Sequence, residues 1–125
     1  MSENSFSKLP VLDDAQINML KETAPDDAAE LFTELKDLFE EESEPLLAKL
    51  EQSIRERDCT GVARSAHALA GSSSNIGYLR LSKMVRALEN SDLNRSTEAL
   101  QQDLSDIQQT YAETRQAMAD LIDSL

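Results

Sequence analysis

The amino-acid sequence predicts an all-α protein: an up-down four-helix bundle preceded by a short cap helix. Apolar residues recur at intervals of three and four through most of the chain, which is the period of an amphipathic helix. Residues that favour turns are scarce, with three Gly and three Pro among 125 residues, and this disfavours a meander of short strands. A chain of this length forms one domain and can bury a core without disulfides or metals.

The N-terminal third of the chain is expected to contain a mobile arm and two helices. Residues 1–10 are mostly polar and form the arm, so the single domain is expected to span 11–125. Asp13, a residue type that caps helices, begins a first helix that ends near Ala24. Pro25 then opens a longer helix. The apolar stripe of this second helix consists of Ala28, Leu31, Leu35, Leu38, Phe39, Leu46, Leu50 and Ile54.

The connections between the later helices carry recognisable start and stop signals. Pro45 lies within the second helix, where we expect a kink and not an end because the apolar stripe resumes beyond it. Asp58 and Thr60 supply capping side chains for a third helix through Ser74, and Gly77 ends or kinks it. The apolar positions of the fourth helix are Leu81, Met84, Val85 and Leu88.

The last helix is predicted to follow a polar turn at 90–94 and to begin near Ser96. Its apolar positions keep a heptad spacing: Leu100, Leu104, Ile107, Tyr111, Thr114, Met118, Leu121 and Leu125. Helices that have short connections and one apolar stripe each are typical of an up-down bundle.

The charge balance excludes several classes of partner. The chain has 24 acidic and 12 basic residues and a net charge of −12. Nucleic acids and anionic membranes require a basic footprint, so neither partner is expected. The single Cys59 is compatible with a reducing compartment. Neither a signal peptide nor an apolar run of transmembrane length is found, which predicts a cytoplasmic protein without membrane insertion.

The single histidine of the sequence, His67, lies in the stretch ARSAHALAGSSSNIG at 63–77. On a helical wheel it stands roughly 140° from the centre of the apolar stripe of its helix and should point to solvent. That stripe consists of Val62, Ala66, Leu69, Ser73 and Ile76. One turn from the histidine lie Ala63, Arg64, Ala70 and Gly71, with Ser74 beyond them.

The small residues around His67 suggest a bare surface. A glycine inside a helix costs about 1 kcal/mol relative to alanine, so Gly71 is locally unfavourable unless something must come close. Two plainer interpretations exist: a solvated surface histidine, and a helix rich in small residues that packs closely against its neighbour. Each explains one feature, but neither explains why the histidine stands beside the glycine.

The segment His67-Ala-Leu-Ala-Gly71-Ser-Ser-Ser-Asn-Ile-Gly77 resembles the signature of the histidine phosphotransfer (HPt) domain family. That signature is a His, a small residue, Leu, usually Lys, Gly, two small residues and a hydrophobic–Gly pair. The resemblance extends to Ala63-Arg-Ser-Ala66, to 81–89, to the helix order and to the proline in the second helix. It covers essentially residues 13–125.

The resemblance implies that His67, through its Nε2 atom, accepts a phosphoryl group from a receiver-domain aspartate and passes it to another receiver. A neutral imidazole is an available nucleophile near neutral pH. The implied partners are receiver domains of response regulators or hybrid sensor kinases. Mg²⁺ and the catalytic lysine would belong to the receiver, so no cofactor or metal is expected in this chain.

One position departs from the family pattern. Ala70 occupies the place of the usual lysine, whose expected role is to screen the phosphoryl charge. Arg64 is predicted to lie on the same face as His67. Lys83 and Arg86 on the following helix are the other candidates for this role, and which basic residue replaces the lysine stays open.

Other functional classes find little support in the sequence. It contains no Ser/His/Asp set, and with one His and one Cys a zinc site would need mostly carboxylates. The acidic runs lack the spacing and glycine of a calcium loop. The absence of a glycine-rich nucleotide motif predicts a phosphoryl carrier without autokinase activity and not an enzyme. The alternative is an HPt-fold docking or sequestering module that binds a receiver without stable phosphorylation.

Overall fold

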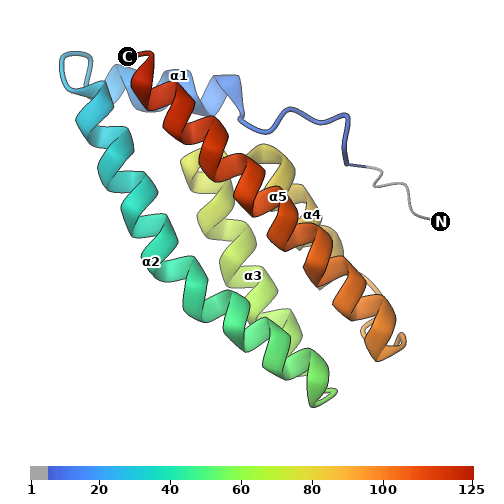
Figure 1. Ribbon diagram of the computed structural model, residues 1–125. Helices are drawn as coiled ribbons and strands as arrows, with labels where there is room; N and C mark the ends of the chain where they lie inside the picture. The colour runs from blue at the N-terminus through green and yellow to red at the C-terminus, as the bar shows by residue number, and fades with distance from the viewer. Residues whose placement is uncertain (1–5) are drawn as a thin grey trace.

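The structure, a computed structural model, describes residues 6–125 and contains five helices in that range. The helices are α1 (Asp14–Thr23), α2 (Ala28–Arg55), α3 (Cys59–Ile76), α4 (Leu79–Glu89) and α5 (Thr97–Asp123). Helices α2 to α5 form a four-helix bundle, in which α2 contacts α3 and α5, and α4 also contacts α3 and α5. Helix α1 lies across one end of these helices, next to the C-terminus (Figure 1). The predicted up-down bundle with a cap helix is confirmed.

Asp13, Asp58 and Ser96 cap three of the helices, whereas Thr60, the other capping residue predicted for the third helix, lies inside α3. Asp13 accepts hydrogen bonds from the backbone N–H groups at the start of α1, and Asp58 and Ser96 do the same for α3 and α5. These side chains satisfy N–H groups that have no partner within the helix. Helix α2 runs through Pro45 without ending, as the apolar pattern predicted. Helix α3 extends two residues beyond the predicted Ser74, to Ile76.

The core departs from the predicted stripes at several positions, among them Phe32, Leu38 and Leu125. Phe32 is fully buried although it stands outside the predicted stripe of α2, whereas Leu38, which was placed on that stripe, is 50% exposed. The prediction for Leu38 was therefore wrong. The stripe is centred nearer Phe32 and Phe39, because both aromatic side chains are buried. Leu125, at the end of the heptad, is also exposed and lies beyond α5.

Three aromatic rings stack edge to face inside the bundle. Phe39 lies with its ring centroid 4.9 Å from that of Tyr78 and 5.6 Å from that of Tyr111. Ser43 donates a hydrogen bond of 2.9 Å to the Tyr111 hydroxyl, whereas the Tyr78 hydroxyl is buried without a partner among residues 6–125. Burial raises the pKa of both phenols. The interior therefore holds one phenol that is hydrogen-bonded and one that is not.

The segment before α1 lies against the bundle. The guanidinium of Arg80 donates hydrogen bonds to the carbonyl oxygens of Ser7 and Leu9, and Phe6 packs against the core. These residues belong to the arm that was expected to be mobile, and residues 1–5 of that arm lie outside the described part of the chain. The boundary between arm and domain stays a prediction.

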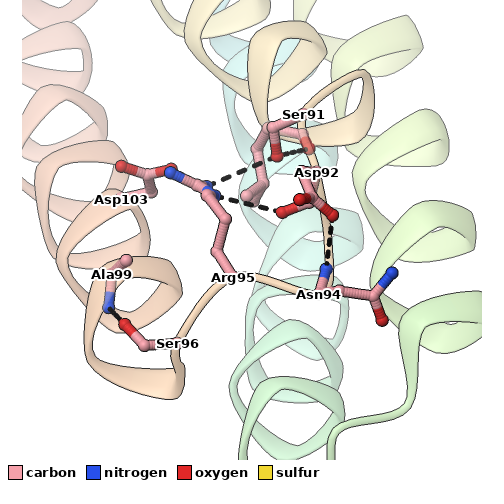
Figure 2. Close-up of polar contacts among 8 residues, drawn as sticks. Ser91, Asp92, Asn94, Arg95, Ser96, Ala99 and Asp103 are labelled. Atoms are coloured by element: carbon pink, nitrogen blue, oxygen red, sulfur yellow. Dashed lines mark hydrogen bonds and ion pairs between the residues drawn. The ribbon is translucent and has the colours of Figure 1, made fainter.

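The connection between α4 and α5 is held by a polar network (Figure 2). Arg95 donates to the carbonyl of Asp92 and forms an ion pair with Asp103 on α5, while Ser96 caps α5 (Figure 2). The connection therefore brings the end of α4 close to the first turns of α5. Within the described chain no helix is long and apolar enough to cross a membrane.

Candidate functional site

His67 lies in the middle of α3, and hydrogen bonds hold both ends of this helix. Asp58 caps the first turn by accepting a 3.0 Å hydrogen bond from the N–H of Gly61. At the other end Gly77 adopts φ 86°, a left-handed conformation that favours glycine, and its carbonyl accepts a 2.8 Å bond from the N–H of Asp13. His67 is therefore presented by a rigid helix and not by a loop.

The His67 side chain points away from the core, as the helical wheel predicted. Its side chain is 70% exposed. The opposite face of α3 is buried and includes the predicted residues Val62, Ala66, Leu69, Ser73 and Ile76. A partner protein could reach the ring without any movement of the bundle.

The imidazole has a carboxylate partner on the neighbouring helix. Nδ1 of His67 lies 2.9 Å from Oε2 of Glu89, the last residue of α4. The other carboxylate oxygen of Glu89 accepts a 3.1 Å hydrogen bond from Nη1 of Arg86, one turn earlier on α4. Three side chains from two helices thus form a chain of contacts that runs from Arg86 through Glu89 to the ring.

This contact determines which ring nitrogen can react. A carboxylate can only accept a hydrogen bond, so in the neutral imidazole Nδ1 carries the proton and Nε2 carries the lone pair. No residue of the described chain forms a hydrogen bond with Nε2, and the ring is mostly exposed. The geometry therefore presents a nucleophilic Nε2 at the surface and needs no base to deprotonate it.

The surface beside His67 is open, as the sequence predicted. A Cβ atom placed on Gly71 would meet no heavy atom within 4 Å. Ser74 and Arg64 are exposed and Ala63 is partly exposed. These residues leave the approach to the imidazole along α3 open.

Comparisons with known proteins agree with this arrangement. The family model described as "Hpt domain" matches residues 34–124, which is most of the chain and includes the whole of α3 and α4. The chain belongs to the Hpt domain family. A solved structure of histidine-containing phosphotransfer protein B from Pseudomonas aeruginosa PAO1 is similar, with 26% sequence identity and a TM-score of 0.75. The similarity covers 94% of this chain and 98% of that chain. No curated protein matches the sequence significantly.

Membership in the Hpt family gives the chain its general function. The chain is a histidine phosphotransfer protein of a phosphorelay, and Hpt domains are phosphocarriers and not kinases. Helix α3 presents one accessible histidine on a stable scaffold. Residues 6–125 contain no group of three or more His, Cys, Asp or Glu side chains arranged to hold a metal ion.

The structure corrects the expected position of Ala70. We expected this residue to lie on the open face beside His67, but it is fully buried and belongs to the core cluster. The physical reason is the width of the buried arc of α3. Helices α2 and α4 pack on either side of α3, so the arc also includes Ser65 and Ala70, beyond the five predicted residues. The Hpt position that usually carries lysine is therefore covered in this chain.

The basic candidates are not equivalent in the structure. Arg86 is connected to His67 through Glu89, whereas Arg64 and Lys83 are exposed and form no ion pair within residues 6–125. Among the supporting residues predicted from the sequence, the structure thus links Arg86 to the histidine, leaves Arg64 and Lys83 free in solvent, and buries Ala70.

Sequence reasoning did not identify Glu89 as a site residue, although a signal was present. Helices α3 and α4 form an antiparallel hairpin that turns at Gly77. His67 lies ten residues before Gly77 and Glu89 twelve residues after it, so the two lie at nearly the same height. Counting from the turn would have placed the end of α4 beside His67.

Proposed function

We propose that His67 is the phosphoryl acceptor of this Hpt protein and that it relays the group between the aspartates of two receiver domains. The observation that carries the proposal is the 2.9 Å contact of Nδ1 with Glu89 beneath a ring that is 70% exposed. This contact leaves Nε2 with a free lone pair at the point where a receiver can approach.

The chemical step requires no proton transfer at the nucleophile. Nε2 attacks the phosphorus of the receiver's aspartyl phosphate, the N–P bond forms, and the acyl O–P bond breaks to release the aspartate carboxylate. The ring then carries a positive charge that the Glu89 carboxylate offsets through Nδ1–H. In the second half of the relay a carboxylate oxygen of another receiver attacks the phosphorus. The N–P bond then breaks. Because Glu89 still accepts the hydrogen bond from Nδ1–H, the released imidazole is the same neutral tautomer that attacked in the first step.

Charge neutralisation would be shared between the two proteins. Phosphoryl transfer depends mainly on positioning and on compensation of the phosphoryl charge. In this chain Arg86 would contribute a cation near the ring, since Glu89 holds it there. Mg²⁺ and a lysine would be contributed by the receiver, as the family resemblance implies. We place the exchange in the cytoplasm, where the free Cys59 would stay reduced.

The test is transfer of labelled phosphate from receiver domains charged with acetyl phosphate. Wild-type protein should gain acid-labile, alkali-stable label, and His67→Gln should gain none while melting at the wild-type temperature, because substitutions at exposed sites usually change stability by about 0.5 kcal/mol or less. With ATP and Mg²⁺ alone, the wild type should stay unlabelled, as expected for a carrier without autokinase activity. Retained label in the His67→Gln variant would identify another acceptor.

The same experiment separates the carrier from a docking or sequestering module. A sequestering module would bind the receiver but would gain no label under any condition. Binding without label in the wild type would therefore favour sequestration over relay.

A further inference from the structure

The last turn of α4 carries both side chains that orient the imidazole of His67. Glu89, its final residue, contacts Nδ1 directly, and Arg86 lies one turn earlier and holds Glu89. The final carbonyl groups of a helix have no partner within the helix, so the last turn frays more readily than the middle. How often Glu89 meets the ring therefore depends on what holds this turn from outside α4.

On the side of α5, the guanidinium of Arg95 holds the residues that follow this turn (Figure 2). Its Nε donates a 3.1 Å hydrogen bond to the carbonyl of Asp92, and Nη2 donates one of 3.4 Å to the hydroxyl of Ser91. Nη2 also forms an ion pair with the carboxylate of Asp103 on α5. The Ser91 hydroxyl in turn donates a 2.7 Å bond to the carbonyl of Leu88. A continuous path of contacts thus leads from α5 to the last turn of α4.

Within the described chain, polar contacts join the last turn of α4 and the three residues after it to only two other helices. The contact between Glu89 and His67 joins them to α3, and the path through Arg95 and Asp103 joins them to α5. Burial of Leu88 also keeps this turn against the core, but apolar contacts have no preferred direction, whereas hydrogen bonds do. The direction in which the end of α4 faces is therefore fixed from the α5 side by Arg95.

The ion pair of Arg95 with Asp103 is partly shielded from water. The exposed fractions of the two side chains are 33% and 37%. Both line a hollow of about 240 Å³ beside the buried side chains of Leu88 and Ile107. Such a pair is screened by salt less than a fully exposed pair. The link between α4 and α5 should therefore persist at physiological ionic strength.

We propose that Arg95 is a positioning residue for phosphoryl transfer: it joins the end of α4 to Asp103 and thereby keeps Glu89 against Nδ1 of His67. The inference rests on the proposed function of His67 and extends it to a residue that does not touch the ring. When Glu89 moves away, the neutral imidazole can carry its proton on Nε2 and then has no lone pair at the exposed nitrogen. Transfer should slow in proportion to the loss of the tautomer that attacks.

The first experiment compares Arg95→Ala with Arg57→Ala. Arg57 is a matched control because its guanidinium donates to the carbonyls of Asn94 and Arg95 and to the hydroxyl of Thr97, and so holds the same loop at its other end. Both variants lose one guanidinium and its hydrogen bonds, so both should lower the Tm. Only Arg95→Ala should lower the ratio of the Nδ1–H to the Nε2–H tautomer of His67, measured by ¹⁵N spectroscopy, and slow transfer, each about two- to threefold.

The second experiment removes the anchor on α5. Asp103→Ala should change the tautomer ratio in the same direction as Arg95→Ala, because Arg95 then has no ion pair with α5. Asp106→Ala is the control, since it removes the same charge from the same helix, and its carboxylate accepts a hydrogen bond from Gln102 on α5 and not from the loop. This control should keep the wild-type tautomer ratio.

Hydrogen exchange shows whether the end of α4 itself is loosened. The N–H groups of Asn90 and Ser91 donate to the carbonyls of Arg86 and Leu88 in the last turn. These two amides should exchange several-fold faster in the two variants that break the link to α5, because local opening there becomes easier. In the two control variants they should exchange as in the wild type.

The outcomes separate this inference from the proposed function. An unchanged tautomer ratio in Arg95→Ala or Asp103→Ala would overturn the inference, while labelling of His67 would still support the relay. An equal change of the ratio in Arg57→Ala would also overturn it, because the effect would then follow the stability of the loop and not its link to α5. If Arg95→Ala does not fold, Asp103→Ala decides by the same measurements. Failure of the wild type to gain label from any receiver would instead overturn the proposed function.

Discussion

Glu89 and His67 meet across the α3–α4 interface, where the carboxylate Oε2 lies 2.9 Å from the imidazole Nδ1. The two residues are 22 positions apart in the sequence, and the hairpin at Gly77 brings them together. Because Glu89 is only 18% exposed and is also held by Arg86, the carboxylate is more constrained than the ring that it orients. The ring nitrogen of His67 that keeps a free lone pair is thus selected by a residue on another helix.

Removing the carboxylate should change the tautomer and slow the transfer. Glu89→Ala is expected to lower the rate of phosphoryl transfer to His67 about fivefold, since a charge-assisted contact at so exposed a ring contributes roughly 1 kcal/mol. The ¹⁵N spectrum of the imidazole should move from Nδ1–H toward Nε2–H. An unchanged tautomer in this variant would show that Glu89 does not select the nitrogen. Glu98→Ala, at an exposed position on α5, is the control.

Arg86 is expected to matter more than Arg64 for the stability of the phosphorylated state. Arg86→Ala should lower the equilibrium occupancy of phospho-His67 about two- to fivefold, because it removes a cation that is linked to the ring through Glu89, and such a charge at an exposed site contributes about 0.5–1 kcal/mol. Arg64→Ala should have a smaller effect, since no described contact orients that side chain toward the ring. The measurement is the distribution of label between His67 and one receiver at two salt concentrations. Equal effects of the two variants would contradict the assignment.

Lysine at position 70 should destabilise the fold. Ala70 is fully buried, so the larger side chain must displace its neighbours before its ammonium reaches water. We expect Ala70→Lys to cost about 1–3 kcal/mol and to lower the Tm by roughly 4 to 12 °C. Ala68→Lys, at an exposed position of the same helix, should melt like the wild type. A wild-type Tm for Ala70→Lys would mean that lysine fits the family position without rearrangement.

A large side chain at Gly71 should block transfer without damage to the bundle. Its Cβ would enter open space, and leucine is the better helix former, so Gly71→Leu should raise the free energy of unfolding by up to about 1 kcal/mol. The same side chain would occupy the approach to His67, and the rate of transfer from a phosphorylated receiver should fall steeply. Gly71→Ala should have a smaller effect on transfer. Normal transfer by the leucine variant would show that the receiver does not approach over this position.

The two interior phenols should make the protein sensitive to alkali. Burial raises the pKa of Tyr78 and Tyr111 in the folded state, so above about pH 10 the unfolded chain ionises first and stability is lost as the pH rises further. Tyr78→Phe should reduce this loss and be neutral or stabilising at pH 7, because the hydroxyl has no described partner. Tyr111→Phe should cost about 1 kcal/mol at pH 7, since it removes the bond to Ser43. Urea unfolding at pH 7 and pH 10.5 distinguishes these cases.

Local features of the sequence determined the helices and the accessible histidine. Asp13, Asp58 and Ser96 begin three helices because their side chains accept backbone N–H groups within the next turn, which is chemistry of neighbouring residues. Gly77 ends α3 because its left-handed φ suits glycine. The spacing of apolar residues in α3 predicted that His67 lies on the outer face. This prediction needs only the geometry of a single helix and not its contacts with other helices.

Tertiary packing alone decided what surrounds the histidine. The contact of Glu89 with His67 depends on how α3 and α4 lie side by side, and no periodicity within one helix contains that register. The burial of Ala70 depends on how far the helices beside α3 cover its flank. Phe32 and not Leu38 is buried in the core because of how α2 is rotated about its own axis. That rotation is set by how the Phe32 and Phe39 rings pack in the interior. Helical periodicity defines faces, but the faces that meet are selected by close packing of whole helices.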